Sequence, residues 1–305
     1  GGNPPAAAGL EAARISRAVG APVKVKWTRP EEFKLGYFRP AAVIDAEASL
    51  DDDGNLTSWF FVNINSGGSA INSPYRIDRK QSEYVDAPSP LSQGSYRALA
   101  ATANNFAREA FMDEMAEAAG RDPLEFRMAH LDNDRMRTVL REAADRFGWE
   151  ESRNTERPGV GAGIACGMEK GSVVACCAEV AVEDGDLSVQ RVCQAFECGA
   201  ILNPENLRAQ VEGCIIMGLG AVLREEVRFD EDGLLNPRFS QYPVPRFSDL
   251  PDLDVHLVDR PQADPAGAGE TPIIAIAPAV AGAVYDATGQ RVRELPIRLS
   301  ETEGT

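Results

Sequence analysis

The chain has 305 residues and a formal net charge of −16, which disfavours phosphate backbones and anionic lipid headgroups as partners because like charges repel. Its composition, 44% hydrophobic and 26% charged, is that of a globular protein, and its length suits one large domain or two ordinary ones. The apolar runs, such as residues 214–223, are shorter than the roughly 20 residues of a membrane span, so we expect a soluble protein with neither nucleic acid nor a membrane as partner.

The N-terminal part of the sequence predicts a helix, a strand and a hairpin. Residues 10–19 place apolar groups beside charged ones at helical spacing and are followed by a glycine. Residues 23–27 alternate apolar and polar side chains, which is the period of a half-buried strand. Residues 41–50 and 56–63 flank an Asp-Gly pair at Gly54, whose positive φ suits a tight hairpin.

Three successive helices are predicted over residues 104–146, the most helical part of the chain. Apolar side chains recur there at helical spacing. Asp122 and Pro123 form an N-cap and an N1 proline for the second helix, and Gly148 ends the third. The polar stretch 150–161 that follows is the best candidate for a domain boundary.

The second half of the chain predicts two more hairpins and two helices. Asp-Gly pairs at Gly185 and Gly233 are each bracketed by strand-like runs. A helix begins at Asn203 and becomes apolar all round toward residue 223, so we expect it to be buried. A last helix covers residues 278–288. Together these elements indicate an α+β fold of hairpin-rich sheets with packed helices, divided into two mixed α/β domains, residues 1–150 and 151–305.

The cysteines and histidines do not suggest a metal site built from protein ligands. The six cysteines include no C-x-x-C pair, which disfavours a zinc ribbon and a cysteine-ligated iron–sulfur cluster. We expect them to be reduced and mostly buried. His130 and His256 are far apart in sequence, and we expect a structural role for each.

The strongest local feature is the loop PAGAGETP at residues 265–272. Its two glycines, one of them Gly269, allow close approach of a bulky ligand, and its two prolines fix the flanks. One ionisable carboxylate, that of Glu270, is thereby held on a rigid loop of small residues, as a general base requires. Taken alone, the pattern also fits an exposed glutamate on a Gly-Pro turn, which is the commoner case.

Two further segments combine tight turns with polar groups. A turn at Cys198 leads into the helix that begins at Asn203, whose free N-terminal amides suit an anionic ligand. Gln210 adds an amide donor and acceptor further along this helix, and Arg97 stands in a tight GSYR segment where it could clamp a phosphate or carboxylate. An ordinary helix cap, a surface glutamine and a solvated arginine are the alternatives. Three glycines within the helix also indicate close approach of backbone or ligand, at positions 213, 218 and 220.

Taken in order, these segments resemble the molybdopterin-binding large subunit of the xanthine dehydrogenase and aldehyde oxidase family, particularly its isoquinoline 1-oxidoreductase-like branch. The resemblance is carried by several blocks in the same order: SRAVGAPVKVKWTRPEEF, QGSYRALAATANNFAREAFMDEMAEAAGRDPLEFRMAHL, ECGAILNPENLRAQVEGCIIMGLGAVL, FSQYPVPRFSDLPDLDVHLV and GAGETPIIAIAPAVAGAV. They cover nearly the whole chain but correspond to the C-terminal part, less than half, of such a subunit.

The resemblance implies the C-terminal portion of a molybdenum hydroxylase, which oxidises a carbon of an N-heterocycle or aldehyde with water as the oxygen source. By this matching, Glu270 in the G-x-G-E loop is the general base. Gln210 in RAQVEG and Gly269, which precedes Glu270 in its loop, contact the cofactor. Arg97 lies near the metal or the substrate. A further loop is implied to supply backbone contacts beside the metal, through Gly171, Ser172, Val173 and Val174.

The implied cofactor is molybdenum-molybdopterin, in its plain or dinucleotide form, with the metal held by the pterin. In this family iron–sulfur clusters and FAD belong to other subunits or domains. The implied partners are therefore iron–sulfur and flavin subunits and the N-terminal half of the large subunit, together with a small heterocycle or aldehyde as substrate.

Two departures from the family pattern bear on these expectations. Ala98 and Leu99 replace the cysteine-bearing turn of aerobic carbon monoxide dehydrogenases, which disfavours that branch. The Phe-Gly continuation of a Gly-rich loop is missing after Gly2, and this motivates the alternative of a cofactor-free scaffold or assembly module. The chain shows no intact secretion signal, so we expect the cytoplasm, with the periplasm as the alternative.

Overall fold

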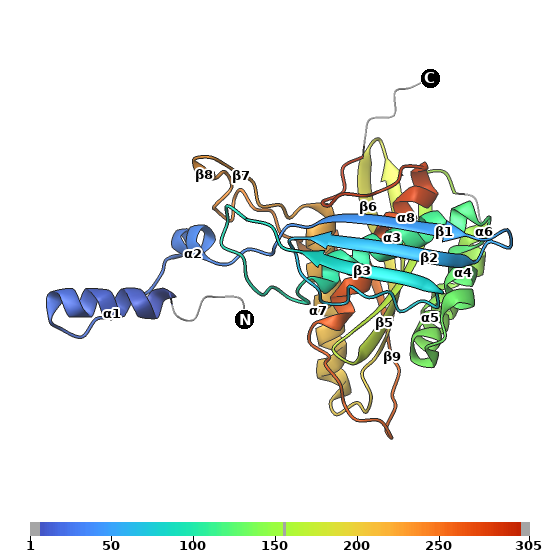
Figure 1. The fold of residues 1–305 in the computed structure, drawn as a ribbon, viewed down its shortest axis with the longest axis horizontal. Coiled ribbons are helices and arrows are strands. Elements are labelled where there is room, and N and C mark those ends of the chain that lie inside the picture. Colours follow the sequence, from blue (N-terminus) through green and yellow to red (C-terminus); the bar gives the residue numbers. More distant parts are fainter. Residues whose placement is uncertain (1–6, 155–156, 300–305) are drawn as a thin grey trace.

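The computed structural model describes residues 7–154 and 157–299. The helices are α1 (Ala7–Val19), α2 (Arg29–Leu35), α3 (Ala101–Ala118), α4 (Pro123–His130), α5 (Asp134–Phe147), α6 (Trp149–Asn154), α7 (Pro204–Leu223) and α8 (Ile276–Thr288), with short 3₁₀ helices η1 (Phe247–Asp249) and η2 (Thr271–Ala275). The strands are β1 (Val43–Leu50), β2 (Leu56–Ile64), β3 (Arg79–Val85), β4 (Val160–Glu169), β5 (Ser172–Glu183), β6 (Asp186–Glu197), β7 (Phe229–Asp230), β8 (Gly233–Leu234) and β9 (Asp252–Leu257). Helices and separate, mostly antiparallel sheets confirm the expected α+β class (Figure 1).

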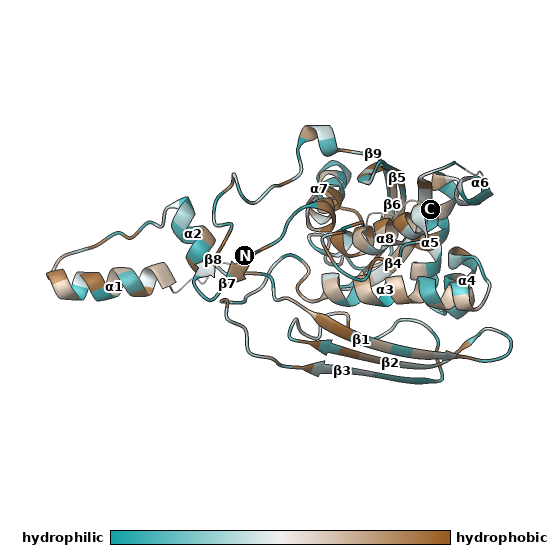
Figure 2. Ribbon diagram, turned by 90° about the horizontal axis from the view of Figure 1, so that it is seen from above, coloured by the Kyte–Doolittle hydropathy of each residue, from teal (hydrophilic) through white to brown (hydrophobic). Residues whose placement is uncertain are grey.

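The first sheet has the strand order β1-β2-β3. β1 and β2 form the predicted hairpin, with Val43 opposite Ile64, and β3 pairs in parallel with β2. Figure 2 shows this sheet as one layer, with α3 and α4 lying over it. Trp59 and Phe61 of β2 are buried in a core cluster with Met112 of α3, because every second side chain of the strand points to the helix layer.

The second sheet has the order β4-β5-β6-β9, and β9 runs parallel to β6. The predicted hairpin of β5 and β6 is confirmed, with Glu183 opposite Asp186. The third predicted hairpin keeps its turn, but its strands β7 and β8 have only two residues each. The three helices predicted over residues 104–146 are confirmed as α3, α4 and α5. Asp122 caps α4, its side chain accepting from two main-chain N–H groups.

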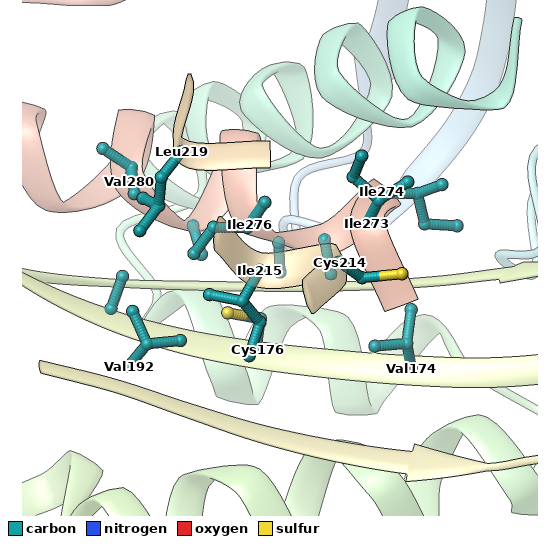
Figure 3. Packing of buried hydrophobic residues seen from close by; sticks show 14 of the residues in the cluster. Val174, Cys176, Val192, Cys214, Ile215, Leu219, Ile273, Ile274, Ile276 and Val280 are labelled. Atoms are coloured by element: carbon teal, nitrogen blue, oxygen red, sulfur yellow. The ribbon is translucent and has the colours of Figure 1, made fainter. Parts of the chain in front are cut away.

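The alternation of side chains along β5 divides the interior into two core clusters. Val174 and Cys176 face α7, η2 and α8, where they meet Ile215. Figure 3 shows Ile215 and Cys214 of α7 lying between β5 and the segment that leads into α8. Val173 and its neighbours two residues apart face the helices of the other cluster, including α5. The sheet is therefore buried on both faces.

The second of these clusters draws residues from both sides of position 150. Leu140 and Phe147 of α5 share it with Val173 and Cys177 of β5. The helices at the end of the first predicted domain thus pack on the sheet of the second. The division into residues 1–150 and 151–305 stays a prediction.

The segment around α1 and α2 lies apart from the main body (Figure 1). Neither helix has a buried residue. The strand predicted for residues 23–27 is wrong: their exposure alternates, but they connect α1 to α2 without a neighbouring strand in the described part of the chain. Alternation alone does not make a strand, because a strand needs hydrogen-bonding partners. The altered Gly-rich start at Gly1 and Gly2 lies outside the described residues.

The segment Thr271–Thr288, which comprises η2 and α8, is long and apolar enough to cross a membrane by length and composition. The expectation that every apolar run falls short of this length is therefore wrong. Of this segment, 67% is buried inside the fold, as in the core helix of a globular domain. Its packing is close, because a Cβ added to Gly163 of β4 would lie 2.1 Å from the carbonyl oxygen of Ala279.

Candidate active site

Three segments that are far apart in sequence meet through the side chain of Arg97. Its Nε donates to the carbonyl oxygen of Gly269 at 2.8 Å, and its Nη2 donates to Oε1 of Gln210 at 3.0 Å. Its Nη1 lies 3.4 Å from the carbonyl oxygen of Gly213. The three nitrogens of the guanidinium therefore bind the loop before η2 and helix α7 at the same time, because the planar group spreads its donors over several positions.

Glu270 joins the same group through its carboxylate. The main-chain N–H of Ala98, next to Arg97, donates to Glu270 Oε2 at 2.7 Å. Glu270 also precedes η2, and its carbonyl oxygen accepts from the N–H of Ile273 at 3.1 Å. All five residues of η2 are buried, so Glu270 stands where a solvent-facing loop enters the core. The structure therefore brings together four of the residues singled out from the sequence: Arg97, Gln210, Gly269 and Glu270.

The loop before Glu270 is fixed by hydrogen bonds on both sides. The N–H of Ala266 donates to the carbonyl oxygen of Cys198 at 2.7 Å, and the N–H of Gly267 donates to that of Lys170 at 3.2 Å. The hydroxyl of Ser172 donates to the carbonyl oxygen of Gly267. The end of β6 and the start of β5 thus hold this loop in place.

The predicted loop 171–174 is only partly beside this site. Gly171 has a φ of 80°, and it stands in the turn between β4 and β5. Ser172 contacts the loop before Glu270. Val173 and Val174 are fully buried within β5, which is paired on both edges. Their main-chain groups belong to the sheet, so a backbone contact from these two residues to a cofactor stays a prediction without geometric support.

Arg39 is a residue near the site that the sequence did not reveal. Its Nη2 donates to the carbonyl oxygen of Arg97 at 2.7 Å, and its Nη1 donates to that of Leu99 at 2.8 Å. It stands between α2 and β1, in a segment with no motif. Arg39 donates to main-chain carbonyl oxygens, which every residue has. The types of the residues it binds therefore gave no sign of this contact in the sequence.

Glu197 is the second residue that was missed. At the end of β6, its carboxylate accepts from the N–H of Gly199 at 2.6 Å and from Nη2 of Arg135 at 3.0 Å. Arg135 also donates to the carbonyl oxygen of Gly171 at 2.8 Å. This buried carboxylate therefore links the turn after β6 to the turn before β5.

All six cysteines are free and buried, as expected, and His130 makes a contact between two elements of the fold. Cys214 lies 3.8 Å from the carbonyl oxygen of Gly269, and burial raises the pKa of its thiol to about 11, so it is protonated at neutral pH. His130 accepts from the N–H of Leu56 at 3.0 Å and links α4 to β2. Within residues 7–154 and 157–299, no three His, Cys, Asp or Glu residues form a metal-binding group.

The donors around Gln210 fit a cofactor rich in ring nitrogens and phosphate oxygens. Gln210 is exposed, and across the described part of the chain its Nε2 has no hydrogen-bond partner. One turn further along α7, a Cβ added to Gly213 would meet no atom within 4 Å, whereas at Gly218 it would lie 2.3 Å from Ile276. Gly218 thus serves helix packing, and Gly213 leaves the helix surface open beside a free amide donor. An amide and exposed main-chain groups bind heteroatoms without adding bulk.

The helix N-terminus proposed for an anionic ligand is already capped. The side chain of Asn203 accepts from the N–H of Asn206 at 3.0 Å at the start of α7. The first turn keeps other free amides, as every helix does. The geometry favours Gln210 rather than this terminus as the ligand-facing part of α7.

Two family models match the chain, each described as a molybdopterin cofactor-binding domain, over residues 5–131 and 97–251. A nicotinate dehydrogenase subunit of Pseudomonas putida is 29% identical over 94% of this chain and 28% of its own length. The beta subunit of isoquinoline 1-oxidoreductase from Brevundimonas diminuta is 31% identical over 95% of this chain and 40% of its own length. The chain therefore spans less than half of the length of these relatives.

Solved structures show the same fold. Quinoline 2-oxidoreductase of Pseudomonas putida has a TM-score of 0.81 at 15% identity, covering 92% of this chain and 63% of that one. The aldehyde oxidoreductase of Desulfovibrio gigas has a TM-score of 0.78 at 14% identity, covering 91% of this chain and 50% of that one. With the family models matching most of its length, the chain belongs to the molybdopterin-binding proteins of the xanthine dehydrogenase and aldehyde oxidase family.

Proposed function

We propose that this chain is the C-terminal, catalytic portion of a molybdenum-dependent oxidoreductase that hydroxylates a carbon of an N-heterocycle or an aldehyde, with water as the oxygen source. The observation that carries the proposal is the meeting of Arg97, Gln210 and Glu270 at one loop. The names of its relatives support the substrate classes, since nicotinate and isoquinoline are N-heterocycles.

Molybdenum-molybdopterin, when bound, supplies the two-electron redox centre of the reaction. In this chain Gln210 would hold it through the free Nε2, with the open helix surface at Gly213 and the main chain at Gly269 leaving it room. Arg97 donates to Oε1 of Gln210, which leaves the Nε2 group of the amide next to Gly269 as the donor for a ligand. Arg97 is therefore an orienting group for the amide and for the loop before Glu270.

Glu270 is the general base of the proposed reaction. Its Oε2 accepts from the N–H of Ala98, which fixes the orientation of the carboxylate. Across the described residues its Oε1 has no partner, so this oxygen takes the proton from the attacking water-derived nucleophile. A positioned carboxylate base of this kind contributes about 10²- to 10⁴-fold to a rate.

The other cofactors of the reaction belong, in this proposal, to other parts of the assembly. Iron–sulfur clusters and FAD are held by partner subunits, and the N-terminal half of the large subunit completes the substrate pocket. The proposed cofactor is molybdopterin in its plain or dinucleotide form, and the assembly acts in the cytoplasm, with the periplasm as the alternative compartment.

Replacing Glu270 tests the proposal in the complete assembly. Glu270→Gln keeps an oxygen for the Ala98 N–H but removes the base, so kcat should fall by about 10²-fold or more while molybdenum and pterin contents stay at the wild-type level. Glu212→Gln, on α7 near Gln210, is the matched control and should keep normal turnover. Normal turnover by fully loaded Glu270→Gln would contradict the proposal.

A cofactor-free scaffold is the competing function, favoured by Asn3 and Pro4 standing after Gly2 in place of the Phe-Gly of the Gly-rich loop. Metal and pterin analysis of the purified assembly separates the two. Stoichiometric molybdenum supports the enzyme, whereas its persistent absence from a complete, freshly isolated assembly supports the scaffold.

A further inference from the structure

The turn that presents the Ala98 N–H to Glu270 has an unusual backbone. Ala98 and Leu99 have φ values of 63° and 50°, in the left-handed region that residues with side chains rarely adopt. Two such residues in succession are unfavourable unless surrounding contacts hold them. Two main-chain hydrogen bonds lie within the turn. The N–H of Leu99 donates to the carbonyl oxygen of Tyr96 at 2.7 Å, and the N–H of Ala101 donates to that of Ala98 at 2.9 Å.

Arg39 contacts this turn through four residues, Tyr96, Arg97, Leu99 and Thr102. Its two terminal nitrogens donate to the carbonyl oxygens of Arg97 and Leu99, which flank Ala98 on either side. Its Nη1 also donates to the hydroxyl of Thr102 at 2.8 Å, in the first turn of α3. Its guanidinium lies 4.5 Å from the centre of the Tyr96 ring, a cation–π distance.

The full set of contacts favours a guanidinium over an ammonium. Two carbonyl oxygens separated by one residue accept from two different nitrogens of the planar guanidinium, and its central carbon lies over the Tyr96 ring. A lysine ammonium can bridge two such carbonyl oxygens, as that of Lys80 does with Ser73 and Tyr75, but all its donors lie on one compact centre, so it could not also keep the bond to Thr102 and the contact with the Tyr96 ring. Arg39 comes from the segment between α2 and β1, 58 positions before Arg97.

These contacts matter for the proposed site because the turn contains Ala98 and Arg97, which bind its other residues. The N–H between the two clamped carbonyls orients Glu270, and the side chain of Arg97 orients Gln210 and Gly269. A shift of this turn would therefore move the proposed base and the proposed cofactor-binding amide together. Displacements of about 1 Å in such groups lower rates by about 10²-fold.

We propose that Arg39 is a positioning residue, which holds the Arg97–Leu99 turn in its left-handed conformation so that Ala98 and Arg97 can orient Glu270 and Gln210. The proposal rests on the proposed function, because it assigns Arg39 a task in that site. It also makes a claim about the backbone of the turn that can be measured without turnover.

The test uses the complete assembly with Arg39→Ala, Arg39→Lys and a matched control. Arg137 of α5 also bridges two carbonyl oxygens, those of Met128 and Leu131, and is half-buried like Arg39, so Arg137→Ala removes a similar clamp elsewhere. Both Arg39 variants should lower kcat by about 10- to 100-fold with KM within about twofold of wild type. Millimolar guanidinium should restore part of the activity of Arg39→Ala, and Arg137→Ala should keep the wild-type kcat.

Hydrogen exchange over residues 96–102 gives the readout that is independent of turnover. The amides of this peptide should exchange faster in both Arg39 variants than in wild type and in Arg137→Ala. Normal kcat and normal exchange in a folded Arg39→Lys assembly would overturn the positioning role, even if Arg39→Ala fails to fold. Failure of the proposed function can be told apart from failure of this proposal. Full activity of Glu270→Gln would contradict Glu270 as the base, whereas the hydrogen-exchange data decide by themselves whether Arg39 holds the turn.

Discussion

The main-chain N–H of Ala98 donates to Glu270 Oε2 at 2.7 Å, across 172 positions of sequence. This bond connects the start of α3 to the start of η2, so the two halves of the chain meet at the proposed base. Ala98 reaches it from a left-handed conformation, which costs a residue with a side chain about 1–2 kcal/mol. The position of Glu270 thus depends on a backbone conformation that its own segment does not determine.

Replacing Ala98 by valine should reveal that conformation. Ala98 is fully buried with a φ of 63°, and a β-branched side chain there adds both crowding and strain. We expect Ala98→Val to lower the free energy of unfolding of the chain by about 3 kcal/mol. Ala100→Val is the matched control, since Ala100 is 4% exposed but has a φ of −71°.

The control should lose only about 1–2 kcal/mol, the cost of crowding alone. Urea unfolding of the two variants and the wild-type chain measures both values. In the complete assembly Ala98→Val should also lower turnover more than Ala100→Val does, because it moves the N–H that orients Glu270. Equal losses of stability in the two variants would show that the backbone conformation is not the source of the effect.

The elements that could be predicted from the sequence are those whose signals are local. α7 begins at the expected Asn203 cap, and α5 ends at the expected Gly148, in the left-handed conformation. β4 was missed because both of its faces are buried and its residues are small, so it shows no alternation. β9 was missed because it pairs in parallel with β6 across a long connection, a contact that no local pattern encodes.

The site shows the same division between local and long-range information. Glu270, Gln210 and Arg97 stand in motifs that resemble those of a known family, and the structure brings them together. Arg39 and Glu197 bind main-chain atoms of distant turns, so their importance depends on the fold rather than on neighbouring residues. The resemblance was therefore enough to indicate the proposed site residues but not the residues that hold them in place.

Glycines at two positions should respond to alanine in opposite directions. In β4, a Cβ on Gly163 would lie 2.1 Å from the carbonyl oxygen of Ala279 and 2.3 Å from the nitrogen of Ala283. These are backbone atoms of α8 and cannot move aside cheaply. We expect Gly163→Ala to lower the free energy of unfolding by about 3 kcal/mol or more.

Gly213 is the contrasting position, because a Cβ there would meet no atom within 4 Å in the middle of α7. Gly213→Ala should raise the free energy of unfolding by about 0.5–1 kcal/mol through helix propensity. Thermal and urea unfolding of the chain without cofactor measure both effects. A loss of stability in Gly213→Ala would mean that the surface beside Gln210 is not open.

Glu197 should make the stability of the chain depend on pH. Burial alone would raise the pKa of its carboxyl, but the hydrogen bonds from Arg135 and Gly199 and the charge of Arg260 outweigh it and hold the pKa below its usual value. A carboxyl with a lowered pKa stabilises the fold above its unfolded-state pKa of about 4.3, and this contribution is lost as the pH falls through the folded-state value. Glu197→Gln should therefore cost about 2 kcal/mol near neutral pH, and the difference from wild type should shrink in acid.

Urea unfolding of wild type and Glu197→Gln at about pH 7 and about pH 3 measures this dependence. Glu83→Gln, an exposed carboxylate on β3, is the control and should differ little from wild type at either pH. If the difference in the free energy of unfolding between wild type and Glu197→Gln stays constant with pH, the effect comes from lost packing rather than from the charge of Glu197. Because Glu197 holds the turns at Gly199 and Gly171, the variant should also loosen the loop before Glu270, and faster hydrogen exchange at Ala266 and Gly267 would report it.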